Sequence, residues 1–143
     1  MNSFVVLPEA FSHEERIPSH VDQLVKVEPL LEQIATRAGL SEERRPLFVV
    51  AITEAIANAI LHGNRQDVSK QVQLRFVYDP GRRVLTVEVE DEGMGFDPTT
   101  LPDPTVGENL FRESGRGIFL MRNLADAVEY KKGGRCVELR FLL

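Results

Sequence analysis

The chain has 143 residues, of which 43% are hydrophobic and 27% charged, as is ordinary for one globular domain. Its formal net charge of −5 argues against a general nucleic-acid-binding protein, whose footprint is basic. A single cysteine excludes an internal disulfide, the three histidines lack metal-ligand spacing, and no segment predicts a leader or a membrane span. We therefore expect a cytoplasmic protein with one domain, residues 1–143, in which any metal ion arrives with a ligand.

The N-terminal part of the chain is expected to form two strands and a helix. Short apolar segments predict strands over residues 4–7 and 11–17. Ser19 is a suitable N-cap for a helix that runs to about Arg37 along an apolar stripe. Pro29 falls inside that pattern and is expected to kink or split the helix.

A second helix is expected over residues 42–61. Gly39 is expected to end the preceding helix, and Ser41 is the expected N-cap of the second. The first turn of this second helix is acidic, as the helix dipole favours. Gly63, in the middle of a His-Gly-Asn stop, is expected to take the left-handed position that follows a helix end.

The C-terminal half predicts a hairpin followed by a long loop. Apolar residues alternate over 72–78 and 84–90 around a turn at 79–82. Residues 91–114 hold three prolines and three glycines without periodicity, which is typical of a functional loop. A short helix (117–125), a turn (131–134) and a closing strand (136–142) complete the chain. The elements predict a two-layer α+β sandwich with helices on one face of a mixed, mainly antiparallel sheet.

Two polar residues interrupt an otherwise apolar helix. Residues 47–61 are nearly all hydrophobic, which predicts a buried helix, yet they include Glu54 and Asn58. A buried carboxylate is costly unless something pairs with it, and residues four apart share one helix face. Glu54 could instead be an ordinary helix acid paired with an arginine. Glu54 and Asn58 are therefore candidates for a site, with that alternative left open.

Two glycine motifs follow. Asp91 comes directly after a strand and is followed by Gly93 and Gly95, and Gly115 and Gly117 precede an apolar helix. The first motif lacks the carboxylates of an EF-hand and the third glycine of a dinucleotide fingerprint, and a plain turn is the simpler alternative. Together with the helix acid and amide, the two motifs indicate a nucleotide site.

These motifs resemble those of the GHKL (Bergerat-fold) superfamily of gyrase, Hsp90, histidine kinases and the MutL repair proteins. The likeness is strongest to the small anti-sigma-factor serine kinases of bacteria. The matching boxes, in family order, are Glu54 to Gly63 (with Asn58 and His62), Asp91-Glu-Gly93-Met-Gly95, and Ser114-Gly115-Arg116-Gly117. The resemblance covers most of the chain and implies an ATP-binding fold.

The resemblance also implies roles for individual residues. Glu54 would activate the nucleophile, Asn58 would hold Mg²⁺ against the triphosphate, and Asp91 would accept the adenine amino group. Oxygen ligands suit Mg²⁺, and burial raises the pKa of a carboxylate toward that of a useful base. Gly93 and Gly95 would let the backbone approach the base. The remaining expected ATP-binding residues are Arg112, Ser114, Gly115, Arg116 and Gly117; the backbone amides of the two glycines and the charge of an arginine suit phosphates.

The sequence departs from the family pattern at three places. Glu113 stands where these kinases tend to carry a basic residue, so Arg112 or Arg116 would have to meet the γ-phosphate. The loop over residues 98–113 is short, which argues against a histidine kinase. Cys136 lies near the usual position of a threonine that helps to bind adenine.

The resemblance predicts an Mg·ATP-dependent serine/threonine protein kinase that acts as an anti-sigma factor. Its substrate would be an anti-sigma-factor antagonist of the STAS type, and a sigma factor would be its second partner. No nucleic acid or membrane is expected as a partner, and a homodimer is left open. The alternative is a non-catalytic, ATP-gated module that sequesters a sigma factor or another regulatory protein.

Overall fold

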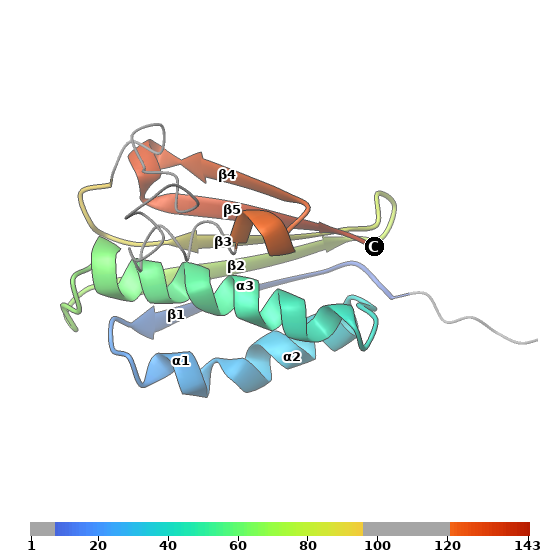
Figure 1. The fold of residues 1–143 in the computed structure, drawn as a ribbon, viewed down its shortest axis with the longest axis horizontal. Coiled ribbons are helices and arrows are strands. Elements are labelled where there is room, and N and C mark those ends of the chain that lie inside the picture. The colour runs from blue at the N-terminus through green and yellow to red at the C-terminus, as the bar shows by residue number, and fades with distance from the viewer. Residues whose placement is uncertain (1–7, 96–120) are drawn as a thin grey trace, which may run out of the picture.

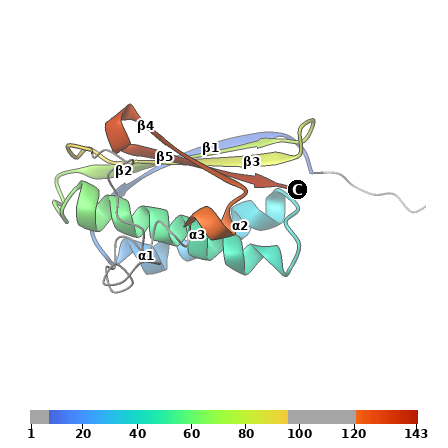
Figure 2. The same ribbon diagram turned by 45° about the horizontal axis from the view of Figure 1, so that its top comes forward.

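The structure, a computed structural model, describes residues 8–95 and 121–143. Within these residues five strands form one sheet in the order β1-β2-β3-β5-β4, and every neighbouring pair is antiparallel. The strands are β1 (Phe11–Pro18), β2 (Gln71–Asp79), β3 (Val84–Glu90), β4 (Ala127–Lys131) and β5 (Cys136–Leu142). The helices α1 (Gln23–Lys26), α2 (Glu28–Arg37) and α3 (Arg44–Asn58) cover one face, which confirms the two-layer fold (Figures 1 and 2).

The core lies between the sheet and the helices because the strands alternate as their sequence predicts. The inward side chains of β2, β3 and β5 are buried: Val72, Leu74, Phe76, Tyr78, Leu85, Val87, Val89, Val137, Leu139 and Phe141. From α3, Phe48 packs edge-on against Phe141 of β5, with ring centroids 4.9 Å apart. Burying such side chains contributes about 1.5–3 kcal/mol each.

The opposite face of the sheet is built from charged pairs. Arg75 of β2 donates to Glu88 at 3.3 Å and to Glu90 at 2.6 Å, both on β3. Lys131 of β4 donates to Glu138 of β5 at 2.9 Å. β2, β3 and β5 therefore each separate an apolar face that packs on helices from a polar or charged face that carries none of the described helices (Figure 2).

The first helical segment differs from its prediction. Ser19 caps no helix: its side chain is buried and its hydroxyl donates to the carbonyl of Lys70 at 2.7 Å. Helical structure begins at Gln23 and is split between α1 and α2, as Pro29 predicts. Pro29 lies in the first turn of α2, where its missing N–H leaves no hydrogen bond unmade.

The second helix begins later than predicted and ends differently. α3 starts at Arg44, so its first turn holds no acid, although the Ser41 hydroxyl accepts the Arg44 N–H at 3.3 Å. Gly39 follows the end of α2, as expected, and has a left-handed φ of +83°. Gly63 does not, because α3 continues as a π-helical turn over Ala59–Gly63. The left-handed positions after the helix fall on Arg65 and Gln66 instead.

Within the described residues, one helical stretch is long and apolar enough to cross a membrane, which the sequence analysis did not expect. This stretch, Arg44–Gly63, is α3 with its π-helical turn, and its mean hydropathy is 1.5. The core helix of a soluble protein meets the same criterion. Here the buried side chains of α3 pack in the core between helices and sheet.

The C-terminal part contains a strand that the sequence analysis missed. β4 forms the sheet edge beyond β5, and a 3₁₀ turn, Lys132–Gly134, joins the two close to the predicted turn. β5 and the β2–β3 hairpin have their predicted places. The strand expected at 4–7 and most of the loop and helix expected after residue 95 lie outside the described residues.

Candidate functional site

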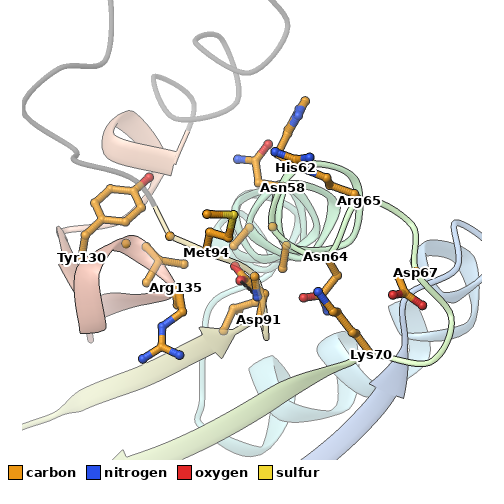
Figure 3. A pocket seen from close by; sticks show the side chains of 18 of the residues that line it. Asn58, His62, Asn64, Arg65, Asp67, Lys70, Asp91, Met94, Tyr130 and Arg135 are labelled. Carbon is orange, nitrogen blue, oxygen red and sulfur yellow. Dashed lines mark hydrogen bonds between the residues drawn. The ribbon is translucent and has the colours of Figure 1, made fainter.

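A pocket of about 620 Å³ lies where the end of α3, the segment after β3 and the β4–β5 turn meet (Figure 3). Its volume is in the range of small-molecule sites. The apolar part of its lining includes Ala55, Ala59, Val89, Met121 and Val137. Convergence of polar side chains onto such an apolar cavity is the usual sign of a ligand site.

Asp91 is the carboxylate of this pocket. It lies between Arg135 on one side and Asn64 on the other (Figure 3). Its Oδ1 accepts the Gly93 N–H at 2.7 Å, and its own N–H donates to the Arg135 carbonyl at 2.8 Å. Burial raises the pKa of Asp91, although the Gly93 hydrogen bond and the Arg135 charge oppose the shift. The half-buried carboxylate keeps acceptor capacity for a donor in the pocket.

The two glycines after Asp91 permit close contacts between backbones. A Cβ on Gly93 would lie 2.0 Å from the carbonyl oxygen of Gly63, at the end of the π-helical turn. A Cβ on Gly95 would lie 2.1 Å from the carbonyl oxygen of Gly133, and Gly95 also has a φ of +78°. The two glycines thus let the segment after β3 lie directly against the end of the π-helical turn and against the β4–β5 turn.

Asn58 and Glu54 occupy different environments. Asn58 lines the pocket near His62, at the end of α3 (Figure 3). Glu54, one turn earlier, is partly exposed and does not belong to the described pocket lining. The expectation of a fully buried acid is therefore wrong, because the described residues leave this side of α3 partly uncovered.

Five of the predicted site residues lie outside the described residues: Arg112, Ser114, Gly115, Arg116 and Gly117. Within the described part, no group of three His, Cys, Asp or Glu side chains could hold a metal ion.

Cys136 does not face the pocket. It belongs to the charged face of β5, where its thiol lies 3.6 Å from Glu88 Oε2, whereas Val137 lines the pocket. Burial, together with the charges of Glu88 and Glu90, raises the pKa of this thiol to about 11. Although Cys136 lies near the expected position of an adenine-binding threonine, its side chain is on the other face of β5 from the pocket, because adjacent strand residues point to opposite faces.

Sequence reasoning missed several pocket residues. Asn64 appeared only as part of a helix stop, and the turn before β5 as a plain turn, yet Asn64, Gly134 and Arg135 all line the pocket. Tyr130 of β4 lines it as well, and burial raises the pKa of its hydroxyl to about 12. The pair of glycines before the last strand was the one local signal for the turn.

Comparison with known proteins identifies a family for this chain. The histidine kinase-like ATPase domain family matches residues 17–141. The serine-protein kinase RsbW of Bacillus subtilis is 31% identical over 124 residues, which cover 80% of this chain and 74% of that protein. RsbW of Listeria monocytogenes is 30% identical over 120 residues, with coverages of 78% and 75%.

Two solved structures share the fold. The RsbU and RsbW domains of a Mycobacterium tuberculosis protein match with a TM-score of 0.62 and 17% identity, over 92% of this chain and 32% of that chain. The histidine kinase domain of a blue-light activated kinase from Erythrobacter litoralis matches with a TM-score of 0.55 and 21% identity, over 89% and 62%. The chain thus belongs to the family of histidine kinase-like ATPase domains, and its relatives there include the RsbW serine-protein kinases.

Proposed function

We propose that the protein is an Mg·ATP-dependent serine/threonine protein kinase that acts as an anti-sigma factor and phosphorylates an anti-sigma-factor antagonist. The observation that carries the proposal is one pocket that joins the half-buried Asp91 to Asn58 at the end of α3. The names of the relatives, serine-protein kinases, support the reaction class. A cytoplasmic location and a sigma factor as second partner belong to the same proposal.

The residues of the pocket fit a purine nucleotide. A flat base needs apolar walls, which Val89, Met121 and Val137 provide. A carboxylate accepts hydrogen bonds well, so Asp91 suits the exocyclic amine of adenine and would repel the carbonyl of guanine. ATP is therefore the nucleotide that this donor and acceptor pattern favours.

Three side chains would serve the transfer itself. ATP supplies the phosphoryl group and its Mg²⁺ neutralises part of the charge, so the protein contributes mainly position and one base. Asn58 offers an amide oxygen, a ligand type that Mg²⁺ accepts. Glu54 would take the proton of the substrate hydroxyl, and its partly exposed place on α3 leaves it accessible to a protein substrate. Arg112 or Arg116 would meet the γ-phosphate.

The second candidate is a module that binds ATP and a sigma factor without turnover. The place of Glu54 outside the described pocket lining favours this alternative over a preformed catalytic centre. The presence of an acid at position 54 favours the kinase, because a module that only binds ATP has no need of a base there.

A transfer assay separates the two candidates. The purified chain is incubated with labelled Mg·ATP and with candidate antagonists encoded in the same operon. The kinase predicts label on a serine or threonine of one antagonist, and much less label with Glu54→Gln. Binding of Mg·ATP and of a sigma factor, without label on any antagonist, would establish the binding module instead.

A further inference from the structure

Asn64 is the most fully buried polar residue of the pocket, with 1% of its surface exposed. It follows the π-helical turn, and its N–H donates to the carbonyl of Ala59, five residues earlier, at 2.8 Å. A π-helical turn inserts one residue into a helix, and such turns are frequent at functional sites. Here the turn brings the Asn64 side chain beneath the pocket, next to Asp91 (Figure 3).

The amide of Asn64 connects three segments that are distant in sequence. Its Nδ2 donates to the Ser19 hydroxyl at 2.8 Å and to the Gln71 carbonyl at 3.0 Å. Its Oδ1 accepts the backbone N–H of Glu92 at 2.7 Å. Both amide hydrogens and the carbonyl oxygen are thus engaged, and a buried amide satisfied in this way has a fixed orientation.

Glu92 is held at a second point. Its carboxylate accepts the Gln71 N–H at 2.6 Å, so backbone and side chain of Glu92 both attach to the region around the start of β2. Glu92 stands between Asp91 and Gly93, whose N–H in turn holds Oδ1 of Asp91 at 2.7 Å. The direction of the Asp91 carboxylate therefore depends on where Asn64 holds the neighbouring peptide.

We propose that Asn64 is a positioning residue for base recognition: it orients Asp91 through the Glu92 backbone and so sets the preference for adenine, with its exocyclic amine, over the same purine without that amine. The inference rests on the proposed function, namely that this pocket binds ATP. A residue that supported only the fold would change stability and all nucleotide affinities alike, without changing the preference between two bases.

The test measures the affinities for Mg·ATP and for the triphosphate of purine riboside, which lacks the amine, by calorimetry. The parent should prefer ATP by about ten- to a hundred-fold, the effect of one charge-assisted hydrogen bond. In Asn64→Ala this preference should fall by about threefold or more. Ser19→Ala is the matched control, because it removes one bond of the same amide and leaves the contact with Glu92; its preference should stay within about twofold of the parent.

A double-mutant cycle shows whether Asn64 acts through Asp91. In an Asp91→Asn background, adding Asn64→Ala should leave the ratio of the two affinities unchanged. If Asn64→Ala does not fold, Glu92→Ala is the substitute, because it removes the hydrogen bond between the exposed Glu92 carboxylate and the Gln71 N–H. The preference for ATP should again fall by about threefold.

Two failures can be told apart. A parent that binds Mg·ATP with a preference that Asn64→Ala and Glu92→Ala both retain overturns the positioning role alone. A parent that binds neither triphosphate overturns the proposed function, and the positioning role with it.

Discussion

Gly63 and Asp91 share one small volume, because a Cβ on Gly63 would lie 2.3 Å from Oδ2 of Asp91. Gly63 has no left-handed φ, so its role follows from the space around it rather than from its backbone conformation. The end of α3 and the carboxylate of the pocket are thus fitted to each other. In the boxes that carry the family resemblance, Gly63 ends the first and Asp91 begins the second.

The first prediction follows from this contact. In Gly63→Ala the added methyl group must displace the Asp91 carboxylate, so the affinity for Mg·ATP should fall by about tenfold or more. Overpacking of this kind costs about 1–3 kcal/mol of unfolding free energy. Calorimetry and urea unfolding measure the two effects. Gly81→Ala, in the β2–β3 turn remote from the pocket, is the control, and equal ATP affinity in both variants would contradict the proposed position of the base.

The second prediction concerns Asp91 and pH. Burial raises the pKa of Asp91 above its ordinary value of 3.8. Below pH 3.8 the Asp91 carboxyl is protonated in both the folded and the unfolded state. As the pH rises from 3.8 toward the higher pKa of the folded state, the unfolded state releases its proton first, so the free energy of unfolding falls. Asp91→Asn avoids this penalty, so its free energy of unfolding should exceed that of the parent at pH 7, and the gain should vanish in acid.

The control variant for this prediction should change the free energy of unfolding at pH 7 in the opposite direction. Hydrogen bonds from Ser69 lower the pKa of Asp67, so its ionisation stabilises the folded state above the ordinary value of 3.8. Asp67→Asn should therefore lose stability at pH 7. Urea unfolding across the pH range measures both variants. An Asp91→Asn protein that is less stable than the parent at pH 7 would mean that the carboxylate is not penalised by burial.

The third prediction separates binding from chemistry. Glu54→Gln keeps the shape of the side chain and removes the base, so phosphoryl transfer should fall by about 10²-fold or more while ATP affinity holds. Asn58→Ala should weaken the binding of Mg·ATP itself. Transfer rates and calorimetry on the two variants give the comparison. Transfer at the parental rate by Glu54→Gln would remove the base from the mechanism.

The fourth prediction concerns the cation that meets the γ-phosphate. Either Arg112→Ala or Arg116→Ala should reduce the affinity for ATP while leaving that for ADP nearly unchanged, since only ATP carries the third phosphate. Arg82→Ala is the control, because Arg82 lies at the exposed β2–β3 turn. An unchanged ratio of ATP to ADP affinity in both variants would exclude both arginines.

The fifth prediction uses the chain's single cysteine as a reporter. Cys136 is 0% exposed and its pKa is raised to about 11, so at pH 8 only about one thiol in a thousand is ionised. Labelling by a disulfide reagent should therefore be slow in native buffer and fast in denaturant. A Ser12→Cys, Cys136→Ser protein, with its thiol on exposed β1, should react at once. Equally fast labelling of the parent would show that the strands open readily around β5.

Local sequence patterns determined much of this fold. Alternation in β2, β3 and β5 is a property of neighbouring residues, because successive side chains of a strand point to opposite faces. Pro29 splits the first helix through its own ring, wherever the rest of the chain lies. The spacing between Glu54 and Asn58 likewise follows from helix geometry alone. The resemblance to the family was carried by the three motif boxes in their order along the chain.

Tertiary structure decided what no local pattern contains. Ser19 has the residue type of an N-cap, yet its hydroxyl accepts from Asn64 and donates to Lys70, fifty-one positions away. β4 is short, with only Val128 and Tyr130 packed against the core, and it is a strand because β5 offers it an edge. Position 63 suits a glycine because the Asp91 carboxylate occupies the space that a Cβ would need. Each of these features depends on which strands become neighbours in the sheet. The strand order is set by burial of the whole core rather than by the residues that flank each feature in the sequence.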